Sequence, residues 1–142
     1  IKITGFSSAL IFGADLRPRT SSFVGEVEHI SPELISDKVI HKSSDLWAFA
    51  TIVFRMISGI PAFRADTPYL VFQKIIALDF DFPQGFSEEA KDFIQKLLVL
   101  RPEDRLGATD QNYKAIKNHS FFQGIQFDSL HVQTPPRMTS TD

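Results

Sequence analysis

The clearest pattern in the chain is a long apolar run at residues 46–57, which predicts a helix. Ser43 or Ser44 can cap its N-terminus, and Asp45 suits the positive end of the helix dipole. Gly59 ends the run. A helix that is apolar all round has to be buried, so we expect this helix to form the centre of the fold. The apolar residues fall on nearly every face: Leu46, Trp47, Phe49, Ile52, Val53, Phe54, Met56 and Ile57.

Further helices are predicted along the C-terminal half of the chain. Thr67 is a cap followed by proline at the first helical position, and this pair predicts a helix over residues 68–77. Ser87 begins another helix, in which apolar residues recur at helical spacing. A weaker helix is predicted over residues 112–118. Residues 79–83 alternate between acidic and aromatic, which is typical of an edge strand or an extended loop.

The two ends of the chain have less regular patterns. Residues 1–4 and 9–11 predict a short pair of strands around a turn, and residues 13–31 predict a long polar loop. We expect residues 1–130 to form one folded region and residues 131–142, rich in Pro, Ser and Thr, to be a disordered tail. The predicted fold is therefore mostly α, with a buried central helix and a short strand pair at the N-terminus.

Composition excludes several classes of protein. The chain has 142 residues, of which 43% are hydrophobic and 23% charged, a normal globular mixture. The net charge of -2 gives no electrostatic case for a nucleic acid or for an anionic membrane. Cysteine is absent, which excludes disulfides and cysteine-bound metals and is compatible with a cytoplasmic protein. The longest apolar stretch is too short to insert into a membrane and is broken by Arg55. The chain begins without methionine inside a predicted strand, so we expect a fragment.

Short motifs in fixed order carry a family resemblance. Gly5-Phe6-Ser7 follows the first predicted strand, and Ser31-Pro32-Glu33 follows the long loop. In order and spacing, these motifs resemble those that bracket the activation segment of eukaryotic protein kinases. The whole chain is similar to the C-terminal lobe of a kinase of the AGC group, within the α+β kinase fold. Further segments that carry the likeness are residues 22–25, 42–48, 69–76 and 133–136.

The resemblance implies roles for individual residues. Glu33 resembles the glutamate that pairs with a buried arginine, here Arg105, although two exposed charges remain the alternative. Asp45 resembles an aspartate that receives backbone N–H groups from the catalytic loop, or it is simply an acid at the start of a helix. Trp47 is expected in the core on either interpretation. Ser22 resembles the activation-loop phosphoserine, and an unmodified serine is the alternative.

The departures from the family pattern bear most directly on function. The family aspartate that holds Mg²⁺ beside ATP is replaced by Gly5, which has no side chain. The sequence contains no His-Arg-Asp, no glycine-rich phosphate loop and no strand lysine, so we expect no catalytic residue, no metal site and no cofactor of its own. Its four histidines are too dispersed to suggest a metal site. Other altered positions are Ser7 for Gly after Phe6, Glu26 for a Thr beside the catalytic aspartate, His29 for Tyr and Ala50 for Gly.

Three functional hypotheses follow from this resemblance. The favoured one is a degenerate, pseudokinase-like lobe that binds a protein partner or a kinase substrate without transferring phosphate. Its exposed candidates for that contact are the helix over 68–77 and the segment 80–86. The first alternative is the C-terminal part of an active, ATP-dependent serine/threonine kinase. The second is a non-functional remnant, because the central helix alone would expose a large apolar patch.

Overall fold

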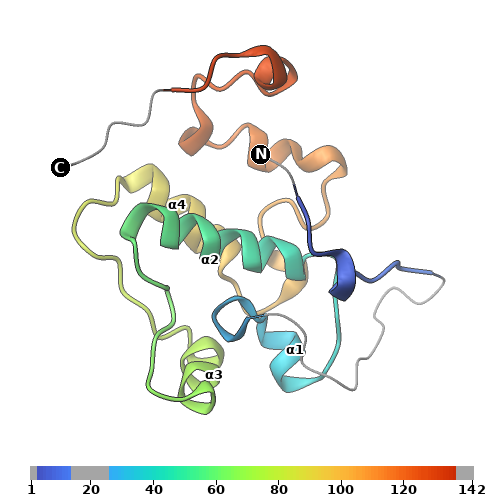
Figure 1. Ribbon diagram of the computed structural model, residues 1–142, viewed down its shortest axis with the longest axis vertical. Helices are drawn as coiled ribbons and strands as arrows, with labels where there is room; N and C mark the ends of the chain where they lie inside the picture. The colour runs from blue at the N-terminus through green and yellow to red at the C-terminus, as the bar shows by residue number, and fades with distance from the viewer. Residues whose placement is uncertain (1–2, 14–25, 137–142) are drawn as a thin grey trace.

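The computed structural model describes residues 3–13 and 26–136, and these are mostly helical, as the sequence pattern predicts (Figure 1). The central helix is α2, and α4 lies behind it in Figure 1 and packs against it. The α-helices are α1 (Pro32–Ser36), α2 (Ser44–Ser58), α3 (Pro68–Ala77), α4 (Glu88–Leu97) and α5 (Lys114–Lys117). The 3₁₀ turns are η1 (Phe6–Ser8), η2 (Val27–His29), η3 (Pro102–Asp104), η4 (Gln111–Tyr113), η5 (Ser120–Phe122) and η6 (Phe127–Val132).

The ends of α2 follow the sequence signals only in part. Gly59 ends the helix in the left-handed region, with φ of 75°, and its N–H donates to the carbonyl of Arg55 at 2.8 Å. Ser43 occupies the N-cap position, but no side chain caps the helix there. The hydroxyl of Ser43 instead donates to the carbonyl of Pro102, and that of Ser44 to Glu33. Both serine hydroxyls therefore form tertiary hydrogen bonds instead of capping the helix.

The expectation that α2 is buried on all faces is wrong. Trp47 and Ala50 are fully buried on the side that faces α4, whereas Ile52 is 43% exposed and Met56 79% exposed on the other side. The helix is apolar all round, but in the described part of the chain the packing elements cover only one of its sides. Phe49 and Ile57 also remain partly exposed.

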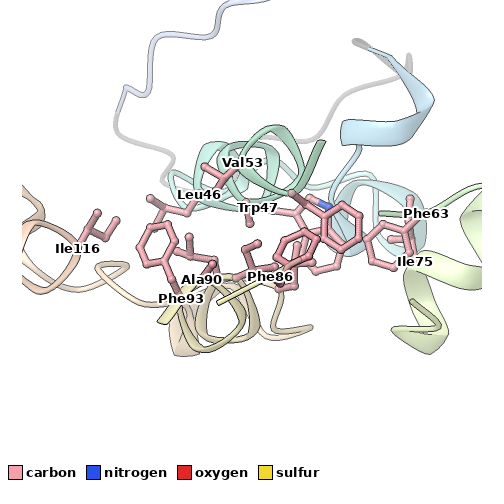
Figure 2. Close-up of a cluster of buried hydrophobic side chains, with 14 of the residues drawn as sticks. Leu46, Trp47, Val53, Phe63, Ile75, Phe86, Ala90, Phe93 and Ile116 are labelled. Carbon is pink, nitrogen blue, oxygen red and sulfur yellow. The ribbon is translucent and has the colours of Figure 1, made fainter. Parts of the chain in front are cut away.

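The core between the helices is rich in stacked aromatic rings. Trp47 stacks on Phe63 with ring centroids 5.6 Å apart. Figure 2 shows this core with Ile75 of α3 at one end and Ile116 at the other. The segment over 79–83 is an extended loop rather than a strand. Its phenylalanines, with Phe86, pack on Phe54, so the prediction that residues 80–86 are an exposed contact surface is wrong for their rings.

The helices after α2 begin where their caps predict. Thr67 accepts a hydrogen bond from the N–H of Leu70 at the start of α3, and Ser87 accepts one from Ala90 at the start of α4. α5 is shorter than the predicted helix over 112–118. Asn112 and Tyr113 have φ of 61° and 55°, and this left-handed backbone delays the start of the helix.

The ends of the chain differ from the sequence pattern. Residues 3–13 contain the turn η1 and no strand, so the predicted strand pair is not found in the part of it that is described. No neighbouring strand among the described residues offers this segment a ladder of hydrogen bonds. At the other end, the predicted tail over 131–142 begins within η6, and residues 137–142 lie outside the described residues.

Candidate functional site

A pocket of about 450 Å³ brings several of the predicted site residues together. The N-terminal segment forms one wall with Gly5 and Phe6, and the start of α2 forms another with Asp45. Glu26 and His29, beside η2, complete the lining on a third side. Residues far apart in the sequence therefore meet here, and the pocket is the candidate site. Ser7 is exposed and does not line the pocket, and Ser22 lies outside the described residues.

Gly5 contributes backbone only to this pocket. Its φ of 75° and ψ of 35° lie in the left-handed region that glycine adopts at little cost. A Cβ built at this position would meet no atom within 4 Å, so the space beside it is open. Phe6 is 68% exposed next to it. The position therefore has room for a carboxylate and does not have one.

Behind the pocket, Glu33 and Arg105 form a buried ion pair although they lie 72 positions apart. Arg105 donates from Nη1 to Oε1 at 2.9 Å and from Nη2 to Oε2 at 2.6 Å. The arginine side chain is 0% exposed and the glutamate side chain 7% exposed. This bidentate geometry excludes the alternative of two solvated charges worth little.

The remaining donors of Arg105 fix the surrounding loops. Its Nε donates to the carbonyl of Val99 at 3.0 Å, and the other N–H groups reach the carbonyls of Ser43 at 2.9 Å and Leu100 at 3.4 Å. All five guanidinium donors therefore have acceptors. Its guanidinium also lies 5.3 Å from the ring centroid of Trp47. The pair thus ties the start of α1, the start of α2 and the loop after α4 to one another.

The charge state of Glu33 follows from these contacts. Burial by itself raises the pKa of Glu33, but the hydrogen bonds and charge of Arg105 and the hydroxyl of Ser44 outweigh it. The net result is a pKa below the ordinary value of 4.5. Glu33 therefore stays ionised, as the bidentate contact requires.

Asp45 and Trp47 have different surroundings although they are neighbours on α2. Asp45 is exposed at the pocket, and its carboxylate has no hydrogen-bond partner among the described residues. Trp47 is fully buried, and its indole Nε1 has no acceptor in the described part of the chain. Asp45 is available to a ligand or partner in the pocket, whereas Trp47 belongs to the core.

His119 has a structural role. It is 9% exposed, its Nε2 lies 2.9 Å from Asp92, and its ring lies 5.1 Å from that of Phe93. It also caps η5 by accepting the N–H of Phe121. These contacts connect α4 to the C-terminal turns and leave His119 outside the pocket.

A cluster that the sequence did not single out lies at one edge of the pocket. Glu26, Glu28 and His29 each place one ligand atom within 4.8 Å of the others. Glu28 also accepts from Arg55 at 2.8 Å. The signal available in the sequence was the spacing Glu-x-Glu-His, in which Glu26 and His29 both depart from the family pattern.

Comparison with known protein families identifies the family of this chain. The family model described as "Protein kinase domain" matches residues 1–122. The chain belongs to the protein kinase family. This places the bracketing motifs and the Glu33–Arg105 pair within one known architecture, the C-terminal lobe of a kinase.

The similar kinases are serine/threonine kinases of the AGC group. The chain is 45% identical over 142 residues to "3-phosphoinositide-dependent protein kinase 1" of Rattus norvegicus, covering 99% of this chain and 25% of that protein. It is 44% identical to "Putative 3-phosphoinositide-dependent protein kinase 2" of Homo sapiens, covering 99% of this chain and 36% of that one. "Serine/threonine-protein kinase ksg1" of Schizosaccharomyces pombe is 40% identical, over 95% of this chain and 24% of that protein. The chain thus spans about a quarter to a third of the length of these relatives.

The magnesium that kinases hold beside ATP does not fit the residues at this position. The family uses the carboxylate of an aspartate there, and Gly5 offers none. Hard divalent cations require such oxygen ligands.

Among the described residues, no helix is long and apolar enough to cross a membrane.

Proposed function

We propose that this kinase lobe binds a protein partner and does not transfer phosphate itself. The observation that carries the proposal is Gly5, where the family has its metal-binding carboxylate. In this proposal the folded domain extends over residues 1–130 and residues 131–142 form a tail. The chain then uses neither ATP nor Mg²⁺, and we propose a cytoplasmic location, which cell fractionation would test.

The electrostatics of the pocket support the proposal. Phosphoryl transfer depends on positioning and on cationic stabilisation of the developing charge. The pocket has the carboxylates of Glu26 and Asp45 on its walls, and Gly5 supplies no metal ligand. An additional carboxylate at Glu26 repels phosphate oxygens rather than stabilising them.

The surface of α3 supports a role in binding a protein. Tyr69 is 68% exposed, Leu70 45% and Ile76 39%. Tyr69 and Ile76 are seven residues apart, so they lie on one side of the helix two turns apart. Exposed apolar side chains gathered on one element are typical of a surface that contacts another protein. Val71 and Ile75 anchor the opposite side in the core, so this surface is held rigidly.

The decisive experiment measures transfer of the γ-phosphate from ATP, with Mg²⁺ present, to a general protein substrate. The expected result is a rate equal to that of the reaction without protein. Asp45→Asn and the exposed control Asp66→Asn provide the comparison, because a contaminating kinase would be insensitive to both. A rate above background that Asp45→Asn removes and Asp66→Asn keeps would overturn the proposal.

The main alternative is the C-terminal part of an active kinase. It is supported by 44–45% identity to relatives that are named as kinases and by the intact Glu33–Arg105 pair. The Gly5→Asp variant separates the two possibilities. The variant is measured in a protein in which this chain is joined to the remainder of a kinase domain. If Gly5 is the reason for inactivity, restoring the carboxylate there raises the rate of phosphate transfer above background. If the native protein is already active, the substitution changes the rate little.

The second alternative, a non-functional remnant, is supported by the exposed apolar side of α2, on which Met56 is 79% exposed. Such a surface favours aggregation if nothing covers it. A cooperative thermal transition of the monomeric chain would exclude this alternative.

A further inference from the structure

A site for a metal ion is indicated at the edge of the pocket, at positions that differ from the kinase pattern. Glu26, Glu28 and His29 bring two carboxylates and an imidazole together, with one ligand atom of each within 4.8 Å of the others. The side chain of His29 is 23% exposed and that of Glu28 34% exposed, so two of the three are partly shielded. Glu26 and His29 stand where the resemblance expects Thr and Tyr, so the kinase pattern does not account for the cluster.

The hydrogen bonds of Thr51 fix the tautomer of His29. The hydroxyl of Thr51 has a single hydrogen, which it donates to the carbonyl of Ala48 at 2.7 Å. The contact of 2.8 Å between this oxygen and Nδ1 of His29 must therefore be donated by the imidazole. The neutral ring then carries its hydrogen on Nδ1 and its lone pair on Nε2. Metal-binding histidines are held in this way, by donating the other ring N–H to a neighbouring group.

Nε2 of His29 lies near another acceptor. Its Nε2 lies 3.7 Å from Oε2 of Glu26, and in a neutral imidazole neither atom carries a hydrogen for the other. Either a metal ion between these two atoms or a proton on Nε2 makes their approach favourable. Glu28 adds a third donor atom, and Arg55 orients it by donating to one of its two carboxylate oxygens at 2.8 Å.

We propose that Glu26, Glu28 and His29 bind one divalent first-row transition ion, with Zn²⁺ as the representative. A mixed nitrogen and oxygen set suits this class of ion, and three protein ligands leave a position for water. Ligands about 2.0–2.2 Å from a tetrahedral ion lie roughly 3.3 Å apart, so the widest separation in the cluster has to contract by up to about 1.5 Å. The Glu26 side chain, 77% exposed, is free to make that movement. The ion attaches residues 26–29 to α2 through the contact between His29 and Thr51.

The test is a calorimetric titration of the metal-free full chain with Zn²⁺ alone. The expected result is one ion per chain, with affinity at least tenfold weaker in Glu26→Gln and in His29→Gln. The controls Glu88→Gln and His131→Gln remove the same types of side chain from exposed positions away from the cluster and leave the affinity unchanged. Mg²⁺ does not compete at equal concentration, because it prefers oxygen ligands alone.

Thr51 provides a test that a merely structural role would not pass. Thr51→Ser keeps the hydroxyl and retains the affinity, whereas Thr51→Val removes the acceptor of the His29 N–H and weakens Zn²⁺ binding about 10–100-fold. Circular dichroism verifies that each variant is folded. If a variant at His29 or Thr51 fails to fold, the exposed Glu26→Gln still decides the outcome. The proposal is overturned if the chain binds no Zn²⁺, as expected when a proton on Nε2 fills the gap, or if Glu26→Gln binds as tightly as the native chain.

Discussion

Two regions that meet at the pocket differ in how strongly the fold constrains them. The arginine network, which we define as Glu33, Ser43, Ser44, Trp47 and Arg105, is mostly buried, and all five guanidinium donors have acceptors. The N-terminal segment, residues 3–13, is mostly exposed, and a Cβ at Gly5 would contact nothing. Breaking the network leaves a buried charge unpaired, whereas altering Gly5 disturbs no packing. The contrast supports our proposal that this kinase lobe has lost its metal ligand while it keeps its fold.

The largest effect on stability is expected when the arginine network loses the side chain of Arg105. Arg105→Ala leaves Glu33 charged and buried without a partner, so the free energy of unfolding should fall by about 3–5 kcal/mol in a urea titration. The matched control is Arg101→Ala, whose side chain is 71% exposed and pairs with Glu103 at 3.1 Å. That variant should change stability by less than about 1 kcal/mol. Equal losses in the two variants would contradict the constraint that we assign to the network.

A pH series tests the charge of Glu33 in the same network. Because the folded pKa of Glu33 lies below 4.5, its contribution is complete above that pH and is lost as the pH falls through the folded pKa. The stability advantage of the native chain over Glu33→Gln should therefore be largest near neutral pH and shrink as the pH is lowered below about 4. An advantage that stays constant over this range would mean that the ionised form is not the one that stabilises the fold.

The glycine that follows the network should be more sensitive than one in open space. Gly107 has φ of 82°, and an added Cβ would lie 3.0 Å from Cδ1 of Ile116. Gly124 has a similar φ of 86° with no atom within 4 Å. Gly107→Ala should lower the unfolding free energy by about 2–3 kcal/mol, and Gly124→Ala by about 1–2 kcal/mol. Thermal denaturation of both variants measures the effect of the contact with Ile116 as the difference between them. Equal losses of unfolding free energy would show that Ile116 moves aside without destabilising the fold.

The smallest effect is expected at the altered metal position. Gly5→Asp puts a side chain on a left-handed backbone, where aspartate is among the better tolerated residues, and the surrounding space is open. We expect a loss of about 1 kcal/mol or less, since an exposed segment can also open locally at low cost. Urea unfolding beside Arg105→Ala measures the contrast directly. A loss as large as that of Arg105→Ala would place Gly5 under the same structural constraint and remove the distinction between the two regions.

The sequence predicts those elements whose determinants are local. Thr67 and Ser87 cap α3 and α4 because an N-cap needs only a hydroxyl three residues before a free N–H. The apolar run of α2 likewise specifies a helix. It does not specify which sides are covered, since Met56 is exposed only because no described element packs over it. The hydroxyl of Ser43 bonds to Pro102, 59 positions away, which no local pattern reveals.

The candidate site was predictable to a smaller degree. The spacing of Glu33 and Arg105 could not separate a buried pair from two solvated charges, and only the family resemblance joined them across 72 positions. The orientation of His29 in the cluster of Glu26, Glu28 and His29 depends on a hydrogen bond to Thr51, which lies on α2. The tautomer that results is a property of the packed structure, so the spacing Glu-x-Glu-His does not reveal it.

The most direct test of the loss of the metal site is the effect of Mg²⁺ on nucleotide binding. A fluorescent ATP analogue is titrated into the chain with and without Mg²⁺, with Gly5→Asp measured in parallel. We expect Mg²⁺ to leave the affinity of the native chain for the nucleotide unchanged, because Gly5 offers no ligand to join the ion to the protein. A clear increase in affinity with Mg²⁺ in the native chain would contradict the loss of the metal site, because another group would then hold the metal.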